Sequence, residues 1–161
     1  MYPTPAFERK LCPPEQFAER VAQLPRPLVF TNGCFDVLHR GHVTYLAQAR
    51  ALGASLIVGV NSDASVKRQG KGDDRPINAQ DDRMAVLAAL ESVSLAVIFD
   101  EDTPLNLILA CQPDILVKGG DWKPENIVGS TEVTGRGGSV HSIPFLHERS
   151  TTALLKKIRS L

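Results

Sequence analysis

The sequence has no excess charge of either sign, few aromatic residues and no long apolar run. Its 18 Lys and Arg residues balance its 18 Asp and Glu residues, so no global field favours nucleic acid or a membrane surface. Aromatic residues make up only 6% of the chain and are not interleaved with basic residues, as they are in many nucleic-acid-binding surfaces. We therefore expect neither nucleic acid nor a membrane among the partners.

Cysteine is also too scarce to stabilise the fold. The three cysteines are an odd number and do not sit at metal-ligand spacing, which argues against a disulfide framework and a structural zinc site. The first dozen residues contain no apolar region of a signal peptide, and the apolar run at residues 95–99 is too short to span a bilayer. These absences favour a soluble protein of a reducing cytoplasm.

What is present fits one compact α/β domain. The chain has 161 residues, of which 43% are hydrophobic, and a domain of this size can bury most of its apolar surface. We divide it into an N-terminal arm and helix at residues 1–26 and a main domain at residues 27–161. Phe17, Val21 and Leu24 share one face of the helix predicted at residues 14–24.

Strand and helix patterns alternate through the main domain. Short apolar runs predict strands at residues 28–31, 56–60, 95–99, 115–117 and 140–143. Helical spacing predicts helices at residues 41–52, 82–90, 103–111 and 151–159. This alternation implies βαβ units and a mostly parallel sheet. We expect a doubly wound α/β fold with five strands in the order 3-2-1-4-5 and helices on both faces. The polar stretch at residues 66–79 is too long for a connector and predicts a functional loop.

The segment from Thr31 to His42 leaves the first strand and enters a helix. Ligands of doubly wound sheets bind beyond the carboxyl ends of the strands, so this segment is the first candidate site. His39 and His42 are three residues apart and share one face of a helical turn, where free backbone amides add positive charge. Gly33 permits a sharp turn, and Gly41 lets a ligand approach the backbone. The pattern suits the phosphates of a nucleoside triphosphate.

Other interpretations of these residues stay open. Either histidine alone could be a structural residue, and a zinc site would need a third ligand that no recognisable spacing provides. Cys34 fits a small packing residue better than a nucleophile. The chemistry that uses both imidazoles is hydrogen-bond donation to phosphate oxygens that gain charge in a transition state.

Residues 65–76 concentrate positive charge in a segment that also contains glycine. The cations are Lys67, Arg68, Lys71 and Arg75. A mobile loop of this kind suits the phosphate of an acceptor or pyrophosphate, although a solvated loop can have the same composition. Arg83 follows in the first turn of the next predicted helix, where it either reaches the same anion or stays exposed.

Two further segments end at the same predicted edge of the sheet. Lys118 leaves the fourth strand, which lies beside the first in this order, and can neutralise oxygens of an α-phosphate. Gly119 and Gly120 open backbone amides to a ligand, and Asp121 could hold a hydroxyl. Residues 150–152 begin the last helix with Ser-Thr-Thr, where hydroxyl groups either cap the helix or hold a β- or γ-phosphate.

Residues 33–36 (GCFD), followed by residues 39–42 (HRGH), resemble the signature of the cytidylyltransferase-like nucleotidyltransferases. This resemblance implies a Rossmann-like core. It also implies that His39 and His42 contact the triphosphate and stabilise the transition state of nucleotidyl transfer.

A closer resemblance covers the chain from about Leu28 to its end. The segments that carry it are residues 60–67, 101–104, 117–122 and 150–152, which are similar to the heptose 1-phosphate adenylyltransferases of that family. It implies ATP as substrate, Mg²⁺ bridging the ATP phosphates, and D-glycero-β-D-manno-heptose 1-phosphate as acceptor. It further implies a role in lipopolysaccharide inner core synthesis in the cytoplasm of a Gram-negative bacterium. Because no sugar-kinase half is present, we expect the stand-alone form, and the resemblance allows a homodimer.

The expected roles can be assigned residue by residue. The catalytic residues are His39, His42 and Lys118. The nucleotide-binding residues are Thr31, Asn32, Gly33, Cys34, Phe35, Gly41, Gly120, Asp121, Ser150, Thr151 and Thr152. The acceptor-binding residues are Asp36, Asn61, Asp63, Lys67, Arg68, Lys71, Arg75 and Arg83. No protein residue is assigned to a metal, because substrate oxygens and water hold most of the coordination sphere of Mg²⁺ in such sites.

The expected reaction is a direct in-line displacement, in which the phosphate of the acceptor attacks the α-phosphorus of ATP and pyrophosphate leaves. No covalent nucleophile is needed, so catalysis would consist of positioning and charge stabilisation. One rival is a cytidylyltransferase that uses CTP and glycerol 3-phosphate or a similar polyol phosphate. A rival of another class is a non-catalytic nucleotide-binding module, which would not require both histidines and Lys118.

Overall fold

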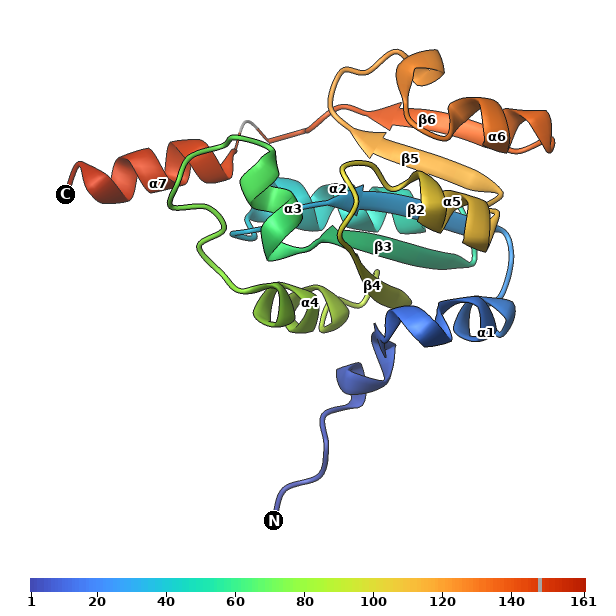
Figure 1. Cartoon of the computed structure of the whole chain (residues 1–161), viewed down its shortest axis with the longest axis horizontal. Coiled ribbons are helices and arrows are strands. Elements are labelled where there is room, and N and C mark those ends of the chain that lie inside the picture. The colour runs from blue at the N-terminus through green and yellow to red at the C-terminus, as the bar shows by residue number, and fades with distance from the viewer. Residues whose placement is uncertain (148) are drawn as a thin grey trace.

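The computed structural model describes residues 1–147 and 149–161, which form a six-stranded parallel sheet with helices on both faces. The strands are β1 (Leu11–Cys12), β2 (Leu28–Gly33), β3 (Ser55–Asn61), β4 (Leu95–Phe99), β5 (Ile115–Gly119) and β6 (Ser139–Ile143). Their order is β1-β4-β3-β2-β5-β6 (Figure 1). The direction of winding therefore reverses between β2 and β5, where a doubly wound sheet opens a crevice for ligands.

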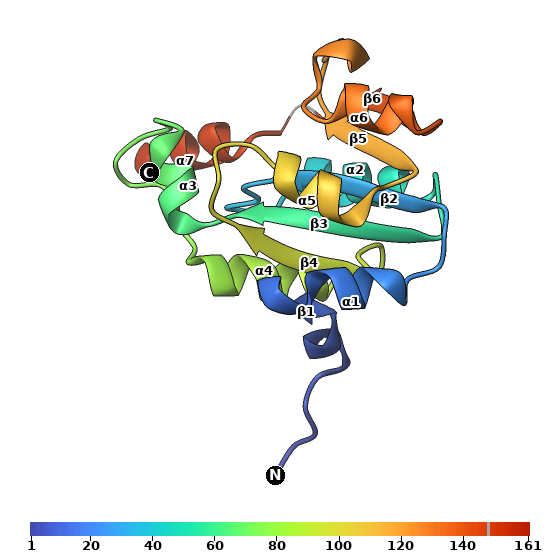
Figure 2. The same cartoon turned by 45° about the vertical axis from the view of Figure 1, so that its right-hand side comes forward.

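The helices and 3-10 turns connect these strands. The α-helices are α1 (Phe17–Ala22), α2 (Arg40–Arg50), α3 (Asp63–Arg68), α4 (Gln80–Ala88), α5 (Leu105–Cys111), α6 (Ser130–Gly135) and α7 (Thr151–Arg159). The 3-10 turns are η1 (Ala6–Lys10), η2 (Pro14–Gln16) and η3 (Pro124–Asn126). Figure 2 shows α5 in front of the sheet and α2 behind it. In the described part of the chain, each helix is too short or too polar to cross a membrane.

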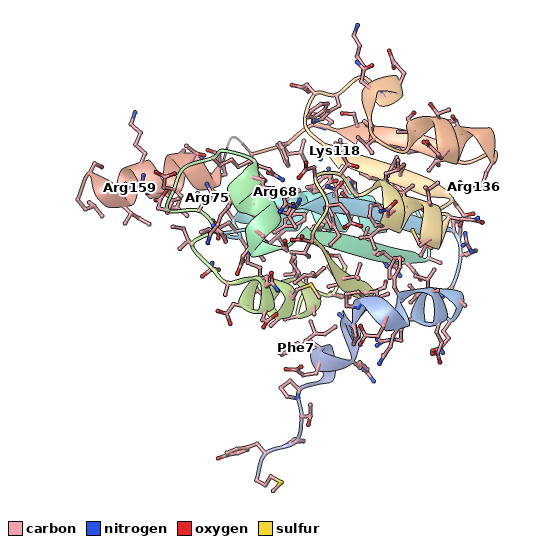
Figure 3. All side chains as sticks on the ribbon, in the orientation of Figure 1. Phe7, Arg68, Arg75, Lys118, Arg136 and Arg159 are labelled. Atoms are coloured by element: carbon pink, nitrogen blue, oxygen red, sulfur yellow. The ribbon has the colours of Figure 1, made fainter. Side chains whose placement is uncertain are left out.

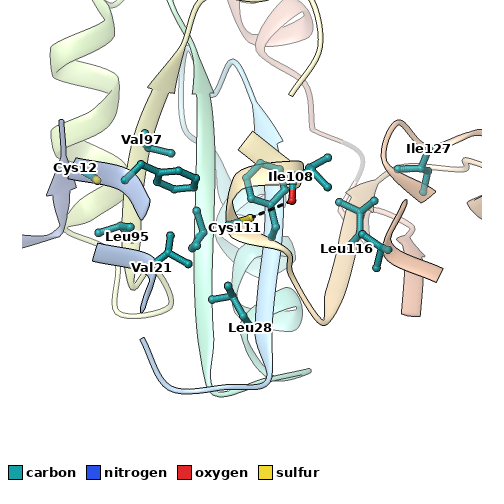
Figure 4. Close-up of a cluster of buried hydrophobic side chains, with 13 residues drawn as sticks. Cys12, Val21, Leu28, Leu95, Val97, Ile108, Cys111, Leu116 and Ile127 are labelled. Carbon is teal, nitrogen blue, oxygen red and sulfur yellow. Dashed lines mark hydrogen bonds between the residues drawn. The ribbon is translucent and has the colours of Figure 1, made fainter. Parts of the chain in front are cut away.

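Two apolar layers lie on opposite faces of the sheet because successive strand residues point to opposite sides. Leu28 and Phe30 pack in one layer with residues of α1, α5 and α6, and Figure 4 shows part of this layer. Val29, between them, packs in the other layer with residues of α2 and α4. All three strand side chains are fully buried, and burial of each contributes roughly 1.5–3 kcal/mol to folding.

The predicted fold class is confirmed, and the structure corrects the strand count. The five predicted strands occur in the predicted order, and the sheet is wholly parallel. The sixth strand, β1, pairs with β4 through Leu11 and Cys12 and comes from the predicted N-terminal arm. Phe17 and Val21 of α1 join the same apolar layer, so residues 11–22 pack directly on the sheet. The proposed boundary after residue 26 stays a prediction.

The polar stretch predicted as one loop at residues 66–79 begins with the end of a helix. Ser62 caps α3, because its Oγ accepts a hydrogen bond of 3.0 Å from the amide of Ser65. The irregular part therefore runs from residue 69 to residue 79, between α3 and α4. This loop lies next to α7, and Asp74 of the loop forms an ion pair with Arg159 of α7.

Candidate active site

A cavity of about 320 Å³ opens where β2 and β5 end and α7 begins. It is lined by residues of the segment after β2, by Lys118 and Gly119 of β5, and by residues 149–152. Four cationic side chains and one carboxylate line it, so the cavity favours an anion. Figure 3 shows Lys118 and Arg75 on the side where the strands end, and Arg136 on the opposite side.

His39 and His42 line this cavity at the start of α2. His39 is the N-cap residue, and His42 follows within the first turn. Their rings stack with centroids 3.8 Å apart and an interplanar angle of 19°. The Nδ1 atoms of both rings are buried without a hydrogen-bond partner among the described residues. A ligand that supplies oxygen atoms at a helix N-terminus would satisfy such nitrogens.

Both imidazoles are poised in the neutral form. Burial is the main cause that lowers the pKa of His42 to about 4, and the charge of His39 lowers it further. The nearby backbone of Val37 offsets this only in part. Burial and then the nearby Arg149 lower the pKa of His39. A bound triphosphate would reverse this effect, because a negative charge favours protonated imidazole.

The two glycines of this segment serve its side chains. A Cβ atom on Gly33 would lie 2.8 Å from the ring of Phe35, and one on Gly41 would lie 3.0 Å from the ring of His39. The predicted sharp turn at Gly33 is wrong: Gly33 ends β2, and Phe35 makes the turn in the left-handed region with φ of 48°. The ring of Phe35 then meets His42 edge-on, at a centroid distance of 5.3 Å. The strained residue thus packs against the imidazole pair.

Lys118 enters the cavity from the end of β5, beside β2. Burial, and then the charge of Lys71, lowers the pKa of Lys118 below its ordinary value. Two like charges that face one cavity repel each other, and an anion placed between them removes that repulsion. The imidazole pair and Lys118 therefore line one cavity, as the expected triphosphate site requires.

Helix α7 brings hydroxyl groups to the same cavity. The Oγ of Ser150 accepts a hydrogen bond of 3.0 Å from the amide of Ala153 and so caps the helix. The hydroxyl of Thr151 donates to the carbonyl of Val37 at 3.2 Å, which ties α7 to the loop before His39. Thr152 lines the cavity beside them. The helix start thus presents its N-terminal charge to the anion site.

A buried ion pair anchors the loop at residues 69–79. Asp36 lies 2.6 Å from the Nε of Arg75 and also accepts hydrogen bonds from the amides of Ile77 and Asn78. Burial raises the pKa of Asp36, but the bonds from Asn78, Ile77 and Arg75 outweigh it and give a net lowering. The carboxylate therefore holds the loop in place, and its expected contact with an acceptor stays a prediction.

Arg83 has a similar internal role in this structure. Its guanidinium is fully buried and donates to the carbonyl of Cys34, the carbonyl of Asn78 and the carboxylate of Asp63. The alternative of an exposed arginine in the first turn is therefore wrong. Arg83 therefore joins the segment after β2 to the loop and to α3. Arg83 and Asp63, which were both expected to bind the acceptor, bind each other in this structure.

The structure brings most of the expected site residues together. Those that line the cavity are His39, His42, Lys118, Asn32, Gly33, Cys34, Phe35, Asp36, Lys71, Arg75, Ser150, Thr151 and Thr152. Asn61 lines an adjoining hollow. Those that line neither are Thr31, Gly41, Gly120, Asp121, Asp63, Lys67, Arg68 and Arg83. Thr31 and Gly41 instead support the site, through a hydrogen bond to the hydroxyl of Tyr45 and through space for His39.

Three lining residues were not expected from the sequence: Tyr45, Phe145 and Arg149. Tyr45 could have been found, because it follows His42 by three residues on the same helix face. Arg149 stands just before the start of α7, at a helix end whose backbone amides attract anions. Phe145 follows β6 with no local signal, and it packs edge-on against Tyr45 at a centroid distance of 5.8 Å.

The described residues contain no group of three or more His, Cys, Asp or Glu side chains that could hold a metal ion. The orphaned Nδ1 atoms and the cationic lining fit phosphate groups instead.

Comparison with known proteins places this site in a family. Residues 30–155 match the cytidylyltransferase-like family. A protein of Bordetella bronchiseptica named D-beta-D-heptose 1-phosphate adenylyltransferase is 55% identical over 155 residues, which cover 95% of this chain and 96% of that protein. The bifunctional protein HldE of Campylobacter concisus is 54% identical over 95% of this chain, which spans only 32% of that protein.

Solved structures share the architecture. The crystal structure of a lipopolysaccharide core biosynthesis protein from Thermoplasma volcanium has a TM-score of 0.62 and 28% identity, and the match covers 76% of this chain and 98% of that one. A pantoate-beta-alanine ligase from Francisella tularensis has the same TM-score at 13% identity, with 88% and 68% of the two chains covered. The second likeness shows the fold alone.

Proposed function

The chain belongs to the cytidylyltransferase-like family, and we propose that it transfers AMP from ATP to D-glycero-β-D-manno-heptose 1-phosphate, giving ADP-heptose and pyrophosphate. The proposal includes a role in lipopolysaccharide inner core synthesis in the cytoplasm. The choice of acceptor and of ATP over CTP is supported by the named relative that is 55% identical along nearly its whole length.

The observation that carries the proposal is the shared cavity of His39, His42 and Lys118. Lys118 lies at the carboxyl end of β5, and the two histidines lie at the start of α2, the helix that follows β2. The strands β2 and β5 are adjacent and parallel. A binding module needs positive charge, but it does not need two neutral imidazoles stacked beside a buried lysine. Groups that donate to an oxygen as its charge grows are what a nucleotidyl transfer requires.

The reaction balances without a covalent enzyme intermediate. An oxygen of the acceptor's phosphate forms a bond to the α-phosphorus of ATP, and the bond between that phosphorus and the bridging oxygen to the β-phosphorus breaks. The electron pair leaves on pyrophosphate. The attacking oxygen is already ionised at neutral pH, so no general base has to remove a proton from it.

We assign the residues to three tasks. His39 and His42 donate to the oxygens of the triphosphate that gain charge, and Lys118 neutralises the α-phosphate between the two substrates. The start of α7, at Ser150, holds the β- and γ-phosphates. Mg²⁺ would enter with ATP as the substrate complex, where it would neutralise charge on the phosphates, and no residue named here would have to hold it.

A pyrophosphate-release assay tests the proposal directly. The purified chain is incubated with MgATP or MgCTP, each combined with D-glycero-β-D-manno-heptose 1-phosphate or glycerol 3-phosphate. We expect release with ATP and the heptose phosphate at least 100-fold faster than with the other three pairs. Release with CTP and glycerol 3-phosphate would instead identify a cytidylyltransferase. Nucleotide binding without release across all four pairs would identify a binding module.

A further inference from the structure

A second hollow, of about 170 Å³, adjoins the triphosphate cavity and shares Asn32 and Lys118 with it. From these two shared residues the second hollow extends away from α7, over the carboxyl ends of β3 and β4. Asn61 ends β3, and Asp102 and Thr103 follow β4. Because β2 and β3 separate β5 from β4, the hollow reaches across a distance of roughly 14 Å, three strand spacings.

The chemistry of this hollow differs from that of the cavity. Lys118, at the shared wall, is its cationic member, and the opposite rim carries the carboxylate of Asp102. Between them lie amide side chains, three apolar side chains (Pro104, Ile127 and Val128) and the indole of Trp122, which is 51% exposed. One aromatic face among several hydrogen-bonding groups suits a polyhydroxylated ring better than a string of phosphates.

Trp122 is held in place by the neighbouring strand. Its amide donates to the Oγ of Ser142 in β6 at 3.0 Å, and the hydroxyl of Ser142 donates to the carbonyl of Gly120. The Nζ of Lys118 lies 5.8 Å from the centroid of the indole ring, within the range of a cation–π interaction. Lys118 can therefore face either the ring or a phosphate at the junction of the two hollows.

We infer that this hollow holds the sugar of the acceptor, with its phosphate at Lys118 and Asn32, its ring on Trp122 and its distal hydroxyls at Asp102 and Thr103. The inference rests on the proposed function. In-line attack requires the acceptor to approach the α-phosphorus from the side opposite to the pyrophosphate. Since α7 and the imidazole pair hold the pyrophosphate, the hollow beyond Lys118 lies on the attacking side.

This placement changes the role expected of Arg68. Its Nε donates to the carboxylate of Asp102 at 2.9 Å, and its side chain lines neither hollow. Arg68 is therefore a positioning residue that orients Asp102, rather than a ligand of the acceptor phosphate. Asp102 becomes the residue that determines specificity for the far end of the sugar.

The chain offers a direct probe, because Trp122 is its single tryptophan. We would measure acrylamide quenching of tryptophan fluorescence with D-glycero-β-D-manno-heptose 1-phosphate alone and with a non-hydrolysable ATP analogue and Mg²⁺ alone. The sugar phosphate should reduce quenching at least twofold, and the nucleotide should leave it nearly unchanged. Protection by the nucleotide and not by the sugar phosphate would overturn the inference and place adenosine in this hollow.

Steady-state kinetics supply the second readout. Asp102→Asn should raise the KM for the sugar phosphate by roughly 10- to 100-fold and change the KM for ATP less than twofold, because a charged hydrogen-bond acceptor is lost. Trp122→Ala should act in the same direction, and Trp122→Phe should restore much of the loss. Phe145→Ala, in the larger cavity, should raise the KM for ATP instead.

Glu125→Gln is the matched control, since this exposed acid lies beside Asn126 but does not line the hollow. It should leave both KM values unchanged. An unchanged KM for the sugar phosphate in Asp102→Asn and Trp122→Ala would overturn the inference while the proposed function stands. If the wild-type chain releases no pyrophosphate but the sugar phosphate still protects Trp122, the proposed function fails and the sugar site stands. If neither readout responds, both are wrong.

Discussion

The imidazole rings of His39 and His42 stack with their centroids 3.8 Å apart at the start of α2. Two positive charges at this separation would repel each other strongly in a partly buried site, and the same helix start already carries partial positive charge. The pair therefore stays neutral until an anion arrives.

The first prediction concerns stability against pH. In the unfolded chain His42 has its ordinary pKa of 6.5, whereas the folded pKa is about 4, so between these values the unfolded chain binds more protons. Wild-type stability should therefore fall as the pH falls through this window, by on the order of 2–3 kcal/mol from this group. His42→Asn should remove that part of the slope. Urea unfolding at pH 4.5, 5.5, 6.5 and 7.5 measures the free energy of unfolding of both proteins. The same dependence on pH in the wild type and in His42→Asn would show that the pKa of His42 is not lowered in the folded chain.

The second prediction concerns the anchor of the loop. Asp36→Asn removes one charge of a pair whose side chains are almost completely buried, and it should cost roughly 3–5 kcal/mol because Arg75 keeps a buried charge. Limited proteolysis should then cut within residues 69–79 faster than in the wild type.

The matched control for this change is Arg159→Gln. It breaks an ion pair with Asp74 whose two side chains are 61% and 47% exposed, and it should cost no more than about 1 kcal/mol. Equal losses of stability in Asp36→Asn and Arg159→Gln, measured by urea unfolding, would show that the buried pair is not an anchor.

The third prediction concerns Gly41. A methyl group there would lie 3.0 Å from the His39 ring, while α2 itself accepts alanine readily. Gly41→Ala should therefore leave the melting temperature near or above that of the wild type and lower kcat by roughly 10-fold or more, because the imidazole is displaced from its position. Ala47→Gly in the same helix is the control, and it should lower the melting temperature and leave kcat unchanged. Normal turnover in Gly41→Ala would show that the exact position of His39 does not matter.

Local patterns in the sequence predicted the strands of the main domain well. The runs at residues 28–31 and 56–60 are apolar and β-branched, and parallel strands covered on both faces need such runs. The pair Leu11–Cys12 is too short to show any period, and its place at the edge of the sheet depends on contacts with Ala96 and Val97 far along the chain. Such a strand cannot be recognised locally.

For the candidate site, the sequence likewise predicted residues that are close together in the chain and missed contacts between distant residues. Residues next to one another in the chain, such as His39 and His42, were found because a short motif carries them. Asp36 and Arg75 are 39 residues apart, and nothing local shows that a carboxylate after β2 pairs with a cation of the loop. Trp122 and Asp102 likewise line one hollow only because β5 and β4 end at the same edge of the sheet.

We expect His42 and Lys118 to act on the same triphosphate in one transition state. A double-mutant cycle on kcat of pyrophosphate release, with His42→Ala, Lys118→Ala and the combined variant, tests it most directly. Each single change should lower kcat by roughly 100- to 1,000-fold with unchanged circular dichroism, and the double variant should lose much less than the product of the two losses. Turnover within a few fold of wild type in either well-folded single variant would contradict the account.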